Sequence, residues 1–320
     1  MKVLHVVPGL DEANNGIAVA AKLIARESAA DMIEARLFAG GDGDVSKHDE
    51  VWVHSAWLPM VLRSCWRVLR AGKRLVRMAH ANYDPVRLKY HVWKKRLVAP
   101  IDRYFLRNAD EVVATCQAEA DWIRAFEPRV KSIGIIDLKR HFNLSRDRVE
   151  LAGGRPLHLL YLGRCHPLKG LEYLEAAVRQ IQGSTCATCS AWSNKIELKI
   201  VSNAFGEEKE RVWNWCDALI LPTISDNFGL VIAEALERGK RVITTDGAPA
   251  WRDDCNEGSG MRNEELGEGK ISCGYDGMLV CVRGYRDGTP EERIQLLKSA
   301  IENLCHAHCL LCWPGLLTVF

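Results

Sequence analysis

Short apolar runs alternate along the chain with amphipathic stretches of helical length. The apolar runs are continuous, which is typical of strands buried on both faces of a parallel sheet. This strand–helix alternation predicts doubly wound α/β structure. The predicted strands are KVLHVV, EARLF, VWVH, RLVRMA, EVVAT, LHLLYLG, ELKIVS, ALILPT, RVITT and GMLVCV, and the predicted helices span 17–27, 58–70, 85–107, 118–126, 171–181, 207–215, 230–238 and 290–304.

The alternation stops once, at a polar, glycine-containing stretch near residue 150, and then restarts. A chain of 320 residues is long enough for two cores of ordinary size. We therefore predict two Rossmann-like domains, residues 1–150 and 151–304, and a tail over residues 305–320. Ligands are expected in a cleft that the two domains face, at the carboxyl ends of the strands of both sheets.

Composition restricts the class of protein. With 48% hydrophobic and 26% charged residues the chain is globular, and no apolar run reaches the roughly 18 residues that a membrane-spanning helix needs. The start MKVLHVVPGL is interpreted as a buried strand and not as a signal peptide, so a cytoplasmic protein is predicted. The CxxC at Cys186 and Cys189 and the tail segment from Cys305 to Cys312 have metal-like spacing. A short Cys/His tract is only a compositional hint, and no metal site is predicted.

Positive charge is concentrated in one part of the chain. Residues 63–107 contain thirteen Lys or Arg and two Asp, a net charge of +11, which leaves −9 for the rest against a total of +2. Such asymmetry favours an anionic partner. Two interpretations stay open: residues 63–107 dock on anionic lipid at the inner face of a membrane, or they form a core helix with a solvated basic face. Nucleic acid is not predicted as a partner, because no recognised binding module is present.

The segment LPTISDNFGLVIAEALERG carries the strongest candidate chemistry. A buried strand is followed by polar residues that favour a helix start, and then by an amphipathic helix. The N–H groups at such a start can hold an anion, and a glycine there permits close approach. A capped helix with a solvated glutamate is the alternative. The candidate residues are Asp226, Asn227, Phe228, Gly229, Leu230 and Glu234.

Two cations follow the first strand of the second predicted domain. Arg164 and Lys169 lie in the loop after LHLLYLG, which faces the ligand crevice in an α/β sheet. Arg offers planar bidentate bonds and Lys a point charge, a combination that suits a phosphate or diphosphate. A solvated lysine is the alternative for either residue alone. Together with the anion-ready helix start in the same domain, they favour a diphosphate site.

These segments resemble the retaining family 4 glycosyltransferases of GT-B fold, which include bacterial lipopolysaccharide and capsule enzymes. The family's acidic residue, followed after seven residues by Glu, is matched by Asp226 and Glu234. Its diphosphate-binding Arg and Lys are matched by Arg164 and Lys169. The resemblance implies that Asp226 lies near the hydroxyls of the donor sugar and that Glu234 lies at the ribose hydroxyls.

The first half of the chain adds two further matches. The family's glycine-rich N-terminal loop resembles Asn15-Gly16, next to the donor phosphates or the acceptor, and its histidine resembles His80 in RLVRMAHANYDP, close to the donor sugar. The loop fits neither GxGxxG nor the P-loop pattern. Asp226 stands where Glu is more usual and Asn15 where Gly is common. Only one helix separates ELKIVS from ALILPT, where members usually have an additional strand and helix.

The resemblance implies transfer of a sugar from a nucleotide-sugar donor to a glycan or lipid-linked acceptor with retention of configuration, in cell-surface polysaccharide or lipopolysaccharide synthesis. The implied catalytic residues are Arg164, Lys169, Asp226 and His80, and no obligatory metal cofactor is implied, because basic residues replace one. Two alternatives stay open. One is a catalytically silent nucleotide-sugar-binding paralogue, and the other is an NAD-dependent oxidoreductase, against which the missing GxGxxG argues.

Overall fold

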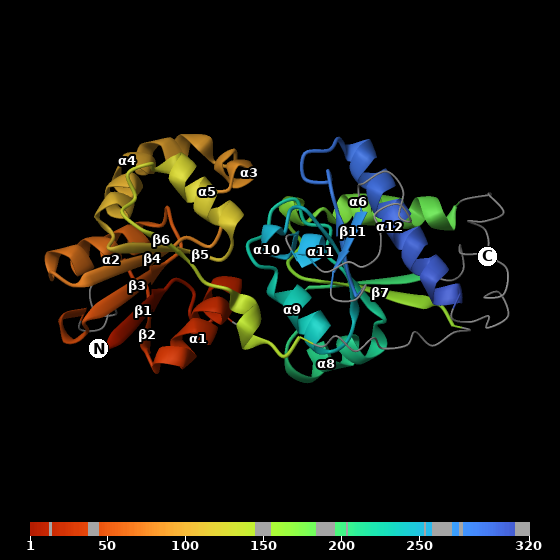
Figure 1. The fold of residues 1–320 in the computed structure, drawn as a ribbon, viewed down its shortest axis with the longest axis horizontal. Helices are drawn as coiled ribbons and strands as arrows, with labels where there is room; N and C mark the ends of the chain where they lie inside the picture. Colours follow the sequence, from red (N-terminus) through yellow and green to blue (C-terminus); the bar gives the residue numbers. More distant parts are fainter. Residues whose placement is uncertain are drawn as a thin grey trace. The chain divides into compact units, whose positions relative to one another are not determined.

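A computed structural model describes residues 1–12, 15–37, 45–144, 155–183, 196–202, 204–252, 254–257, 271–274 and 278–310. The chain divides into two compact units, Met1–His141 (unit 1) and Phe142–Phe320 (unit 2), each built around its own sheet (Figure 1). The boundary predicted near residue 150 lies outside the described residues.

Unit 1 is a parallel sheet of six strands in the order β2-β1-β3-β4-β5-β6, with helices packed against it. Its strands are β1 (Val3–Val7), β2 (Asp31–Glu34), β3 (Glu50–His54), β4 (Arg74–Met78), β5 (Glu111–Ala114) and β6 (Ile133–Ile135). Its helices are α1 (Gly16–Ser28), α2 (Pro59–Arg70), α3 (Pro85–Leu88), α4 (Val92–Asn108) and α5 (Gln117–Phe126), with short 3-10 turns η1 (Val45–Lys47) and η2 (Leu138–His141).

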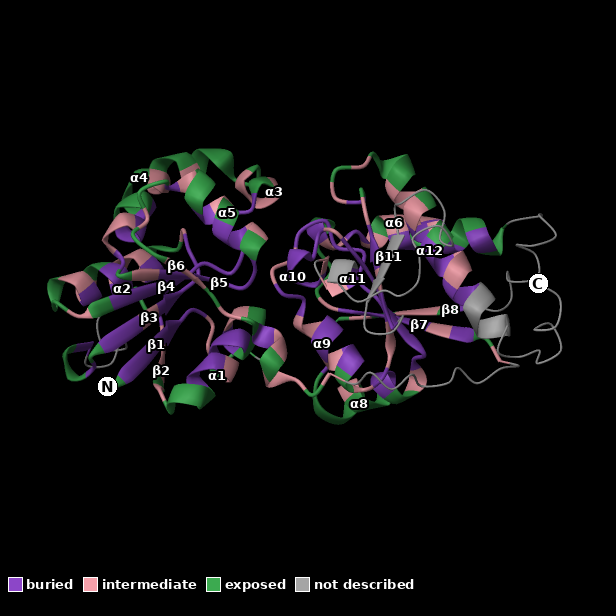
Figure 2. Cartoon of the chain, in the orientation of Figure 1, coloured by how far each residue is buried: buried purple, intermediate pink, exposed green. Residues whose placement is uncertain are grey.

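Alternation along the strands of unit 1 divides the core between two faces. Leu4 and Val6 of β1 are buried in the main cluster with residues of α2, α4 and α5, whereas Val7 packs with Ala18 and Ala21 of α1. Neighbouring strand residues point to opposite faces, so helices cover both sides of the sheet. Figure 2 shows the central strands as buried and the outer sides of the helices as exposed.

Unit 2 is a second six-stranded sheet, in the order β11-β12-β10-β9-β7-β8. All its pairs are parallel except β11 with β12. The strands are β7 (Leu157–Leu162), β8 (Ile196–Val201), β9 (Ala218–Ile220), β10 (Arg241–Thr245), β11 (Ile271–Gly274) and β12 (Leu279–Val282). The helices are α6 (Leu171–Gln182), α8 (Gly206–Trp215), α9 (Leu230–Glu237), α10 (Pro249–Arg252), α11 (Asp254–Glu257) and α12 (Pro290–Leu310), with the 3-10 turn η3 (Pro167–Lys169).

The predicted fold class, two Rossmann-like α/β units, is confirmed, but several elements differ from their prediction. The strand expected at 34–38 lies at Asp31–Glu34, because the Glu34 carboxylate accepts the N–H groups of Gly9 (2.8 Å) and Leu10 and so holds the end of β2 against the loop after β1. The helix expected over 85–107 is broken into α3 and α4 at His91, which has left-handed φ of 52°.

The last helix is longer than predicted. It was expected to end at residue 304, but α12 continues to Leu310 and takes in the first part of the Cys/His segment. Cys186, Cys189 and Cys312 lie outside the described residues. Over the described part of the chain, no three His, Cys, Asp or Glu side chains are placed to hold a metal ion together. None of the described helices has the length and apolarity required to span a bilayer.

Candidate functional site

Three loops meet at the carboxyl edge of the unit 2 sheet, after β7, β9 and β10. The loop after β9 lies between the other two: the Ile224 N–H donates to the Leu168 carbonyl (2.8 Å), and the Asp226 N–H donates to the Gly247 carbonyl (2.8 Å). These backbone bonds join the loops directly, so the side chains that they carry are held in fixed positions.

Two glycines permit this close approach. A Cβ on Gly170, whose φ is +64°, lies 2.1 Å from the Pro222 carbonyl oxygen. A Cβ on Gly247 lies 2.1 Å from the Thr223 carbonyl oxygen. Real Cβ atoms do not come this near to backbone, and therefore both positions require glycine.

Lys169 and Asp226, which the sequence predicted separately, form an ion pair at the meeting point of the loops. Lys169 ends η3, Asp226 lies in the loop before α9, and the Lys169 ammonium donates to Asp226 Oδ2. The two side chains are only 16% and 18% exposed. Asp226 Oδ1 also accepts the N–H of Asn227 at 2.8 Å. A partly buried cation is thus held by one carboxylate, which leaves its other N–H donors for a ligand.

Arg164 lies exposed in the loop after β7. Its carbonyl accepts the phenol of Tyr161 at 2.8 Å. Burial raises the pKa of Tyr161, so the phenol keeps its proton and the hydrogen bond. Within the described ranges no acidic side chain pairs with Arg164. The Arg164 backbone is therefore anchored, while its guanidinium stays available to an anion.

Helix α9 begins at an N-cap residue that makes no side-chain capping bond. Its N-cap is Gly229, with a left-handed φ of 63°. Phe228 beside it is buried at 3% exposure, and its carbonyl accepts the indole N–H of Trp251. Phe228 therefore acts as packing that fixes the helix start, whereas Gly229 and Leu230 contribute backbone. Uncapped N–H groups together with the helix dipole make an anion-binding position.

Glu234 lies one turn into α9 and is paired with Lys209 of α8. The Lys209 ammonium is 2.8 Å from Glu234 Oε1 and 2.7 Å from Oε2, but only Oε1 lies in a direction suited to a hydrogen bond. Glu234 Oε2 is buried, and no described donor is aligned with it. The sequence alone does not single out Lys209, because a lysine on an exposed helix is indistinguishable from a solvated one until its contact with Glu234 is seen.

In unit 1, Asn15 caps α1 and holds the loop before it. Its Oδ1 accepts the N–H of Ile17 (3.1 Å), and its Nδ2 donates to the carbonyls of Pro8 (2.7 Å) and Gly9 (3.0 Å). Gly16, a predicted donor-binding residue, is the exposed first residue of α1. Asn15 therefore closes the loop between β1 and α1 and fixes the point at which the helix begins with Gly16.

His80 follows β4 in a strained turn at the carboxyl edge of the unit 1 sheet. It and Ala81 have φ of 54° and 57°, and Ser55 and Trp57 after the neighbouring β3 have φ of 76° and 67°. Positive φ is uncommon for residues other than glycine and tends to gather at functional sites. The buried Glu119 carboxylate accepts the Ala81 N–H and stabilises this turn. The strain marks this edge as the candidate site of unit 1.

His80 is the end of a line of three buried histidines. His5 Nδ1 is hydrogen-bonded to His54 Nε2 (2.9 Å), and His54 Nδ1 to His80 Nε2 (2.8 Å). Their exposed fractions are 1%, 0% and 5%. Burial lowers the pKa of His5 to about 4 and that of His80 to about 3, and it lowers the pKa of His54 well below its usual value. The three imidazoles are therefore neutral at physiological pH.

The sequence pattern indicated His80 but neither His5 nor His54. Each sits in a predicted strand, KVLHVV or VWVH, where one histidine is more simply interpreted as part of the core. One feature of the sequence could have indicated His5 and His54: each places a polar imidazole among apolar residues of a predicted strand. Their pairing depends on β1 lying beside β3, and on β3 lying beside β4.

Comparison with known proteins agrees with this architecture. Residues 46–133 match the family model described as glycosyl transferase 4-like domain, a range that includes His54 and His80. A sequence search of curated proteins gives no match.

Solved structures of similar fold span nearly the whole chain. Sucrose-phosphate synthase from Thermosynechococcus elongatus is 14% identical, with a TM-score of 0.56 over 98% of this chain and 100% of that chain. HepE from Anabaena, solved in complex with UDP and glucose, is 15% identical, with a TM-score of 0.57 over 97% and 94%. The UDP-forming α,α-trehalose-phosphate synthase of Burkholderia vietnamiensis is 11% identical, with a TM-score of 0.57 over 95% and 92%.

The protein therefore has the fold of GT-B glycosyltransferases, with two Rossmann-like units. Residues 46–133 are similar to a glycosyl transferase 4-like domain.

Proposed function

We propose that the protein is a retaining glycosyltransferase that moves a sugar from a nucleotide-sugar donor to a glycan or lipid-linked acceptor in cell-surface polysaccharide or lipopolysaccharide synthesis. The observation that carries the proposal is the Lys169–Asp226 pair beside the uncapped start of α9, at one strand edge of a GT-B fold. UDP-sugars are the first donors to test, because HepE was solved with UDP and glucose and the Burkholderia synthase is named UDP-forming.

The reaction breaks the bond between the anomeric carbon of the sugar and the diphosphate oxygen. The acceptor oxygen bonds to the anomeric carbon from the same face, and its proton passes to the departing diphosphate. Negative charge grows on that diphosphate, and preorganised positive groups that meet it lower the barrier. Lys169, the Arg164 guanidinium and the N–H groups at Gly229 supply this charge from the chain itself. We therefore expect turnover to survive a metal chelator.

Glu234 is assigned to the ribose of the donor. The Lys209 ammonium lies 2.8 Å from Glu234 Oε1 and 2.7 Å from Oε2, so it offsets the charge of the carboxylate and fixes its position. A carboxylate oxygen has more than one lone pair, and the held carboxylate can therefore accept a ribose hydroxyl as well. Asp226, with one oxygen on Lys169, both positions that cation and retains acceptor capacity for a sugar hydroxyl.

A panel of nucleotide sugars tests the assignment, with the melting temperature and nucleotide release as the two measurements. A donor should raise the melting temperature, and release should require an acceptor. Lys169→Ala and Glu234→Ala should each abolish the thermal shift, whereas Lys298→Ala, which removes a lysine paired with Glu302 on α12, should not. Survival of binding in both site variants would remove the site assignment, and no shift with any nucleotide sugar would remove the function.

The same panel separates the two alternatives. A catalytically silent paralogue would show the thermal shift without nucleotide release in the presence of any acceptor. An NAD-dependent oxidoreductase would be stabilised by NAD and not by nucleotide sugars.

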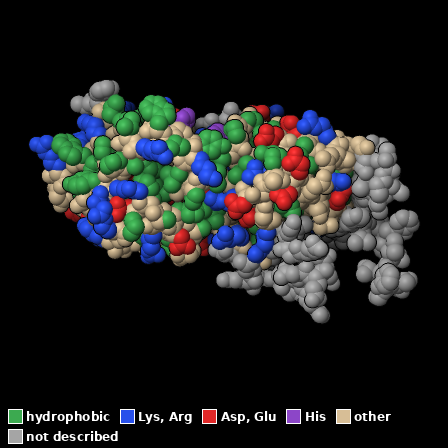
Figure 3. All heavy atoms as spheres, turned by 90° about the horizontal axis from the view of Figure 1, so that it is seen from above, with side chains coloured by type: hydrophobic (Ala, Val, Ile, Leu, Met, Phe, Trp, Pro, Cys, Tyr) green, Lys and Arg blue, Asp and Glu red, His purple; other side chains and the backbone are tan. Residues whose placement is uncertain are grey.

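We also propose that unit 1 docks on anionic lipid through the outer face of α4. This face is the stripe of Trp93, Leu97, Ile101 and Tyr104, which are 51% to 70% exposed. Their spacing of four, four and three residues places them on one side of the helix. Exposed Lys94, Arg96 and Arg103 lie among them on the same helix. In Figure 3, hydrophobic and basic side chains are interspersed on the side of unit 1 that α4 covers.

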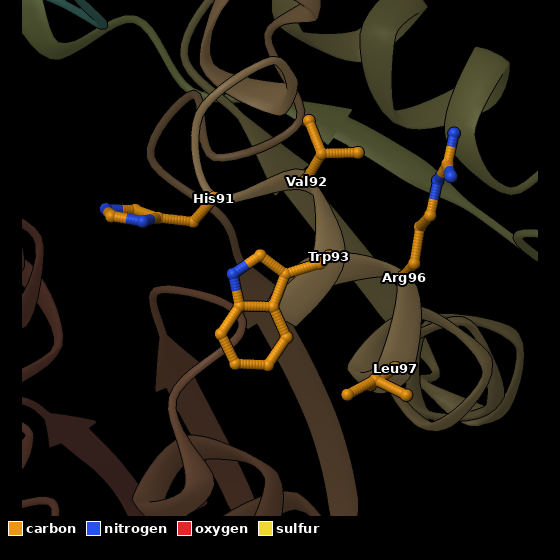
Figure 4. A pocket seen from close by; sticks show the side chains of 5 residues that line it. All are labelled: His91, Val92, Trp93, Arg96 and Leu97. Carbon is orange, nitrogen blue, oxygen red and sulfur yellow. The ribbon is translucent and has the colours of Figure 1, made fainter.

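The charge of helix α4 favours an anionic lipid surface as its partner. The only acid of α4, Asp102, is fully buried and paired with Arg77 at 3.1 Å, so the helix presents no negatively charged side chain to solvent. Near an anionic leaflet each such cation contributes about 1 kcal/mol. An open pocket of about 760 Å³ at the start of α4 is lined by His91, Val92, Trp93, Arg96 and Leu97 (Figure 4). None of the predicted donor-binding residues lines it.

Sedimentation with vesicles tests the docking. The protein should pellet with phosphatidylglycerol-containing vesicles at low salt, less at high salt, and weakly with pure phosphatidylcholine. Leu97→Ser combined with Ile101→Ser should reduce pelleting. Ile135→Ser removes an exposed apolar side chain (49%) on β6 of the same unit and should not. No pelleting at low salt with anionic vesicles rejects the proposal.

A further inference from the structure

The three buried histidines of unit 1 form one continuous hydrogen-bonded line from β1, through the end of β3, to the turn after β4. Successive ring centroids are 5.1 Å apart, and the Trp52 ring lies beside both His5 (5.2 Å) and His54 (6.4 Å). No described carboxylate is bonded to the line, so its hydrogen bonds are made between imidazoles only.

The proton positions in such a line depend on one another. A neutral imidazole carries one N–H and one lone pair, and each of the two hydrogen bonds needs one of each. If His5 donates from Nδ1, then His54 accepts at Nε2 and carries its proton on Nδ1, and His80 in turn accepts at Nε2 and carries its proton on Nδ1. If His80 donates from Nε2, all three carry the proton on Nε2. Only these two arrangements make both bonds, and in each of them the three histidines share one tautomer.

We propose that His5 and His54 are positioning residues that select the tautomer of His80, and thereby decide whether His80 Nδ1 donates to or accepts from a hydroxyl of the donor sugar. The bond made by one imidazole nitrogen sets the state of the other nitrogen, so control of Nε2 is control of Nδ1. The proposal rests on the proposed function, because the sugar is taken as the ligand of His80.

The surroundings of His80 support this role. The turn that carries it is held in a positive-φ conformation and fixed by Glu119 through the Ala81 N–H. The charge of Arg87 lies near enough to His80 to disfavour an imidazolium. His80 is thus held neutral and rigid, and the one property left to set is which nitrogen bears the proton.

Nitrogen NMR of the full chain labelled with ¹⁵N-histidine tests the proposal without any need for activity. His5, His54 and His80 should show the same tautomer and should not titrate near pH 6.5, the usual value for histidine. In His54→Phe, which keeps an aromatic ring at this position but removes both hydrogen bonds, the His80 signals should shift to a mixture of tautomers. In His5→Phe, which removes only the hydrogen bond between His5 and His54, the His80 signals should shift as well.

His48→Gln is the matched control, because His48 is also buried in unit 1 but pairs with Asp31 outside the line. It should leave the His80 signals unchanged. Unlike tautomers among the three residues of the wild type would overturn the proposal, even if the variants fail to fold. So would unchanged His80 signals in both phenylalanine variants.

Kinetics provide the second measurement, with a donor that the panel identifies. His54→Phe should lower kcat on the order of tenfold with a smaller change in KM for the donor, by analogy with the loss of other residues that orient an active group. His54→Gln, which keeps one donor and one acceptor, should retain more of kcat. Equal kcat in wild type and His54→Phe contradicts the inference. If the tautomers are as expected but no nucleotide sugar is bound, the failure lies in the proposed function and not in the histidine line.

Discussion

Acidification from about pH 7.5 to about pH 5.5 is expected to destabilise unit 1 through its three buried histidines. In the folded protein burial lowers the pKa of His5 from 6.5 to about 4 and that of His80 to about 3, and it also lowers the pKa of His54. Because each folded pKa lies below the unfolded value, the unfolded chain binds more protons at acid pH. The stabilisation is complete above about pH 7 and is lost as the pH falls through 6.5 toward the folded values.

The magnitude follows from the proton difference. Each pH unit below the unfolded pKa is worth about 1.4 kcal/mol per histidine that stays neutral in the folded state. One unit below 6.5 therefore costs about 1.4 kcal/mol per residue and about 4 kcal/mol for the three together. A domain has a total stability of about 5–15 kcal/mol, so unit 1 loses much of its stability over two pH units.

Amide hydrogen exchange of the full chain, corrected for intrinsic rates, measures this loss unit by unit. Protection of the β3 amides (Glu50–His54) should decrease as the pH is lowered. The amides of β9 (Ala218–Ile220) in unit 2 serve as the internal reference. Burial also raises the pKa of Glu119, and protonation of that carboxyl opposes the trend. Glu119 is present in both wild type and His54→Phe, so its contribution cancels when the two are compared. If the free energy of unfolding of unit 1 decreases equally in both on acidification, His54 is not held neutral in the folded state, which contradicts the prediction.

Three further predictions concern unit 2. Asp226→Asn should lower kcat on the order of 100-fold, because Lys169 loses the carboxylate that holds it. Asp226→Glu should retain most of the activity, and equal rates for the two variants in a nucleotide-release assay would contradict this prediction. Lys209→Met should weaken donor binding about tenfold in calorimetry, since Glu234 then keeps a partly buried charge without its partner, and an unchanged Kd would remove Lys209 from the site. Gly247→Ala should destabilise unit 2 by about 2 kcal/mol in exchange experiments, because its Cβ would lie 2.1 Å from the Thr223 carbonyl oxygen; a stability equal to wild type would show that these loops can move apart.

Much of the architecture follows from local pattern. Continuous apolar runs separated by helical stretches predict two doubly wound units, because burial on both faces of a sheet selects such runs wherever they occur in the chain. The strands that the pattern missed or misplaced are short or peripheral. β6 has only three residues, and β2 is positioned by the Glu34 carboxylate on the loop after β1, a contact that no local pattern encodes.

The candidate residues of the donor site were also visible in the sequence, because an anion site needs cations and a helix start, and Arg164, Lys169, Asp226 and Glu234 supply these types of group in one predicted domain. Their partners were not visible. Lys169 and Asp226 are 57 residues apart, and they meet only because β7 and β9 are neighbours in the sheet.

The line of histidines shows the same limit in unit 1. His5 and His54 are 49 residues apart, and each is an unremarkable residue in its own strand. The order β1-β3-β4 and the parallel register bring their imidazoles within hydrogen-bonding distance of one another and of His80. The sequence by itself determined which residues are available and which elements carry them. The tertiary structure alone decided which side chains touch, because strand order and register are set by the packing of the whole sheet.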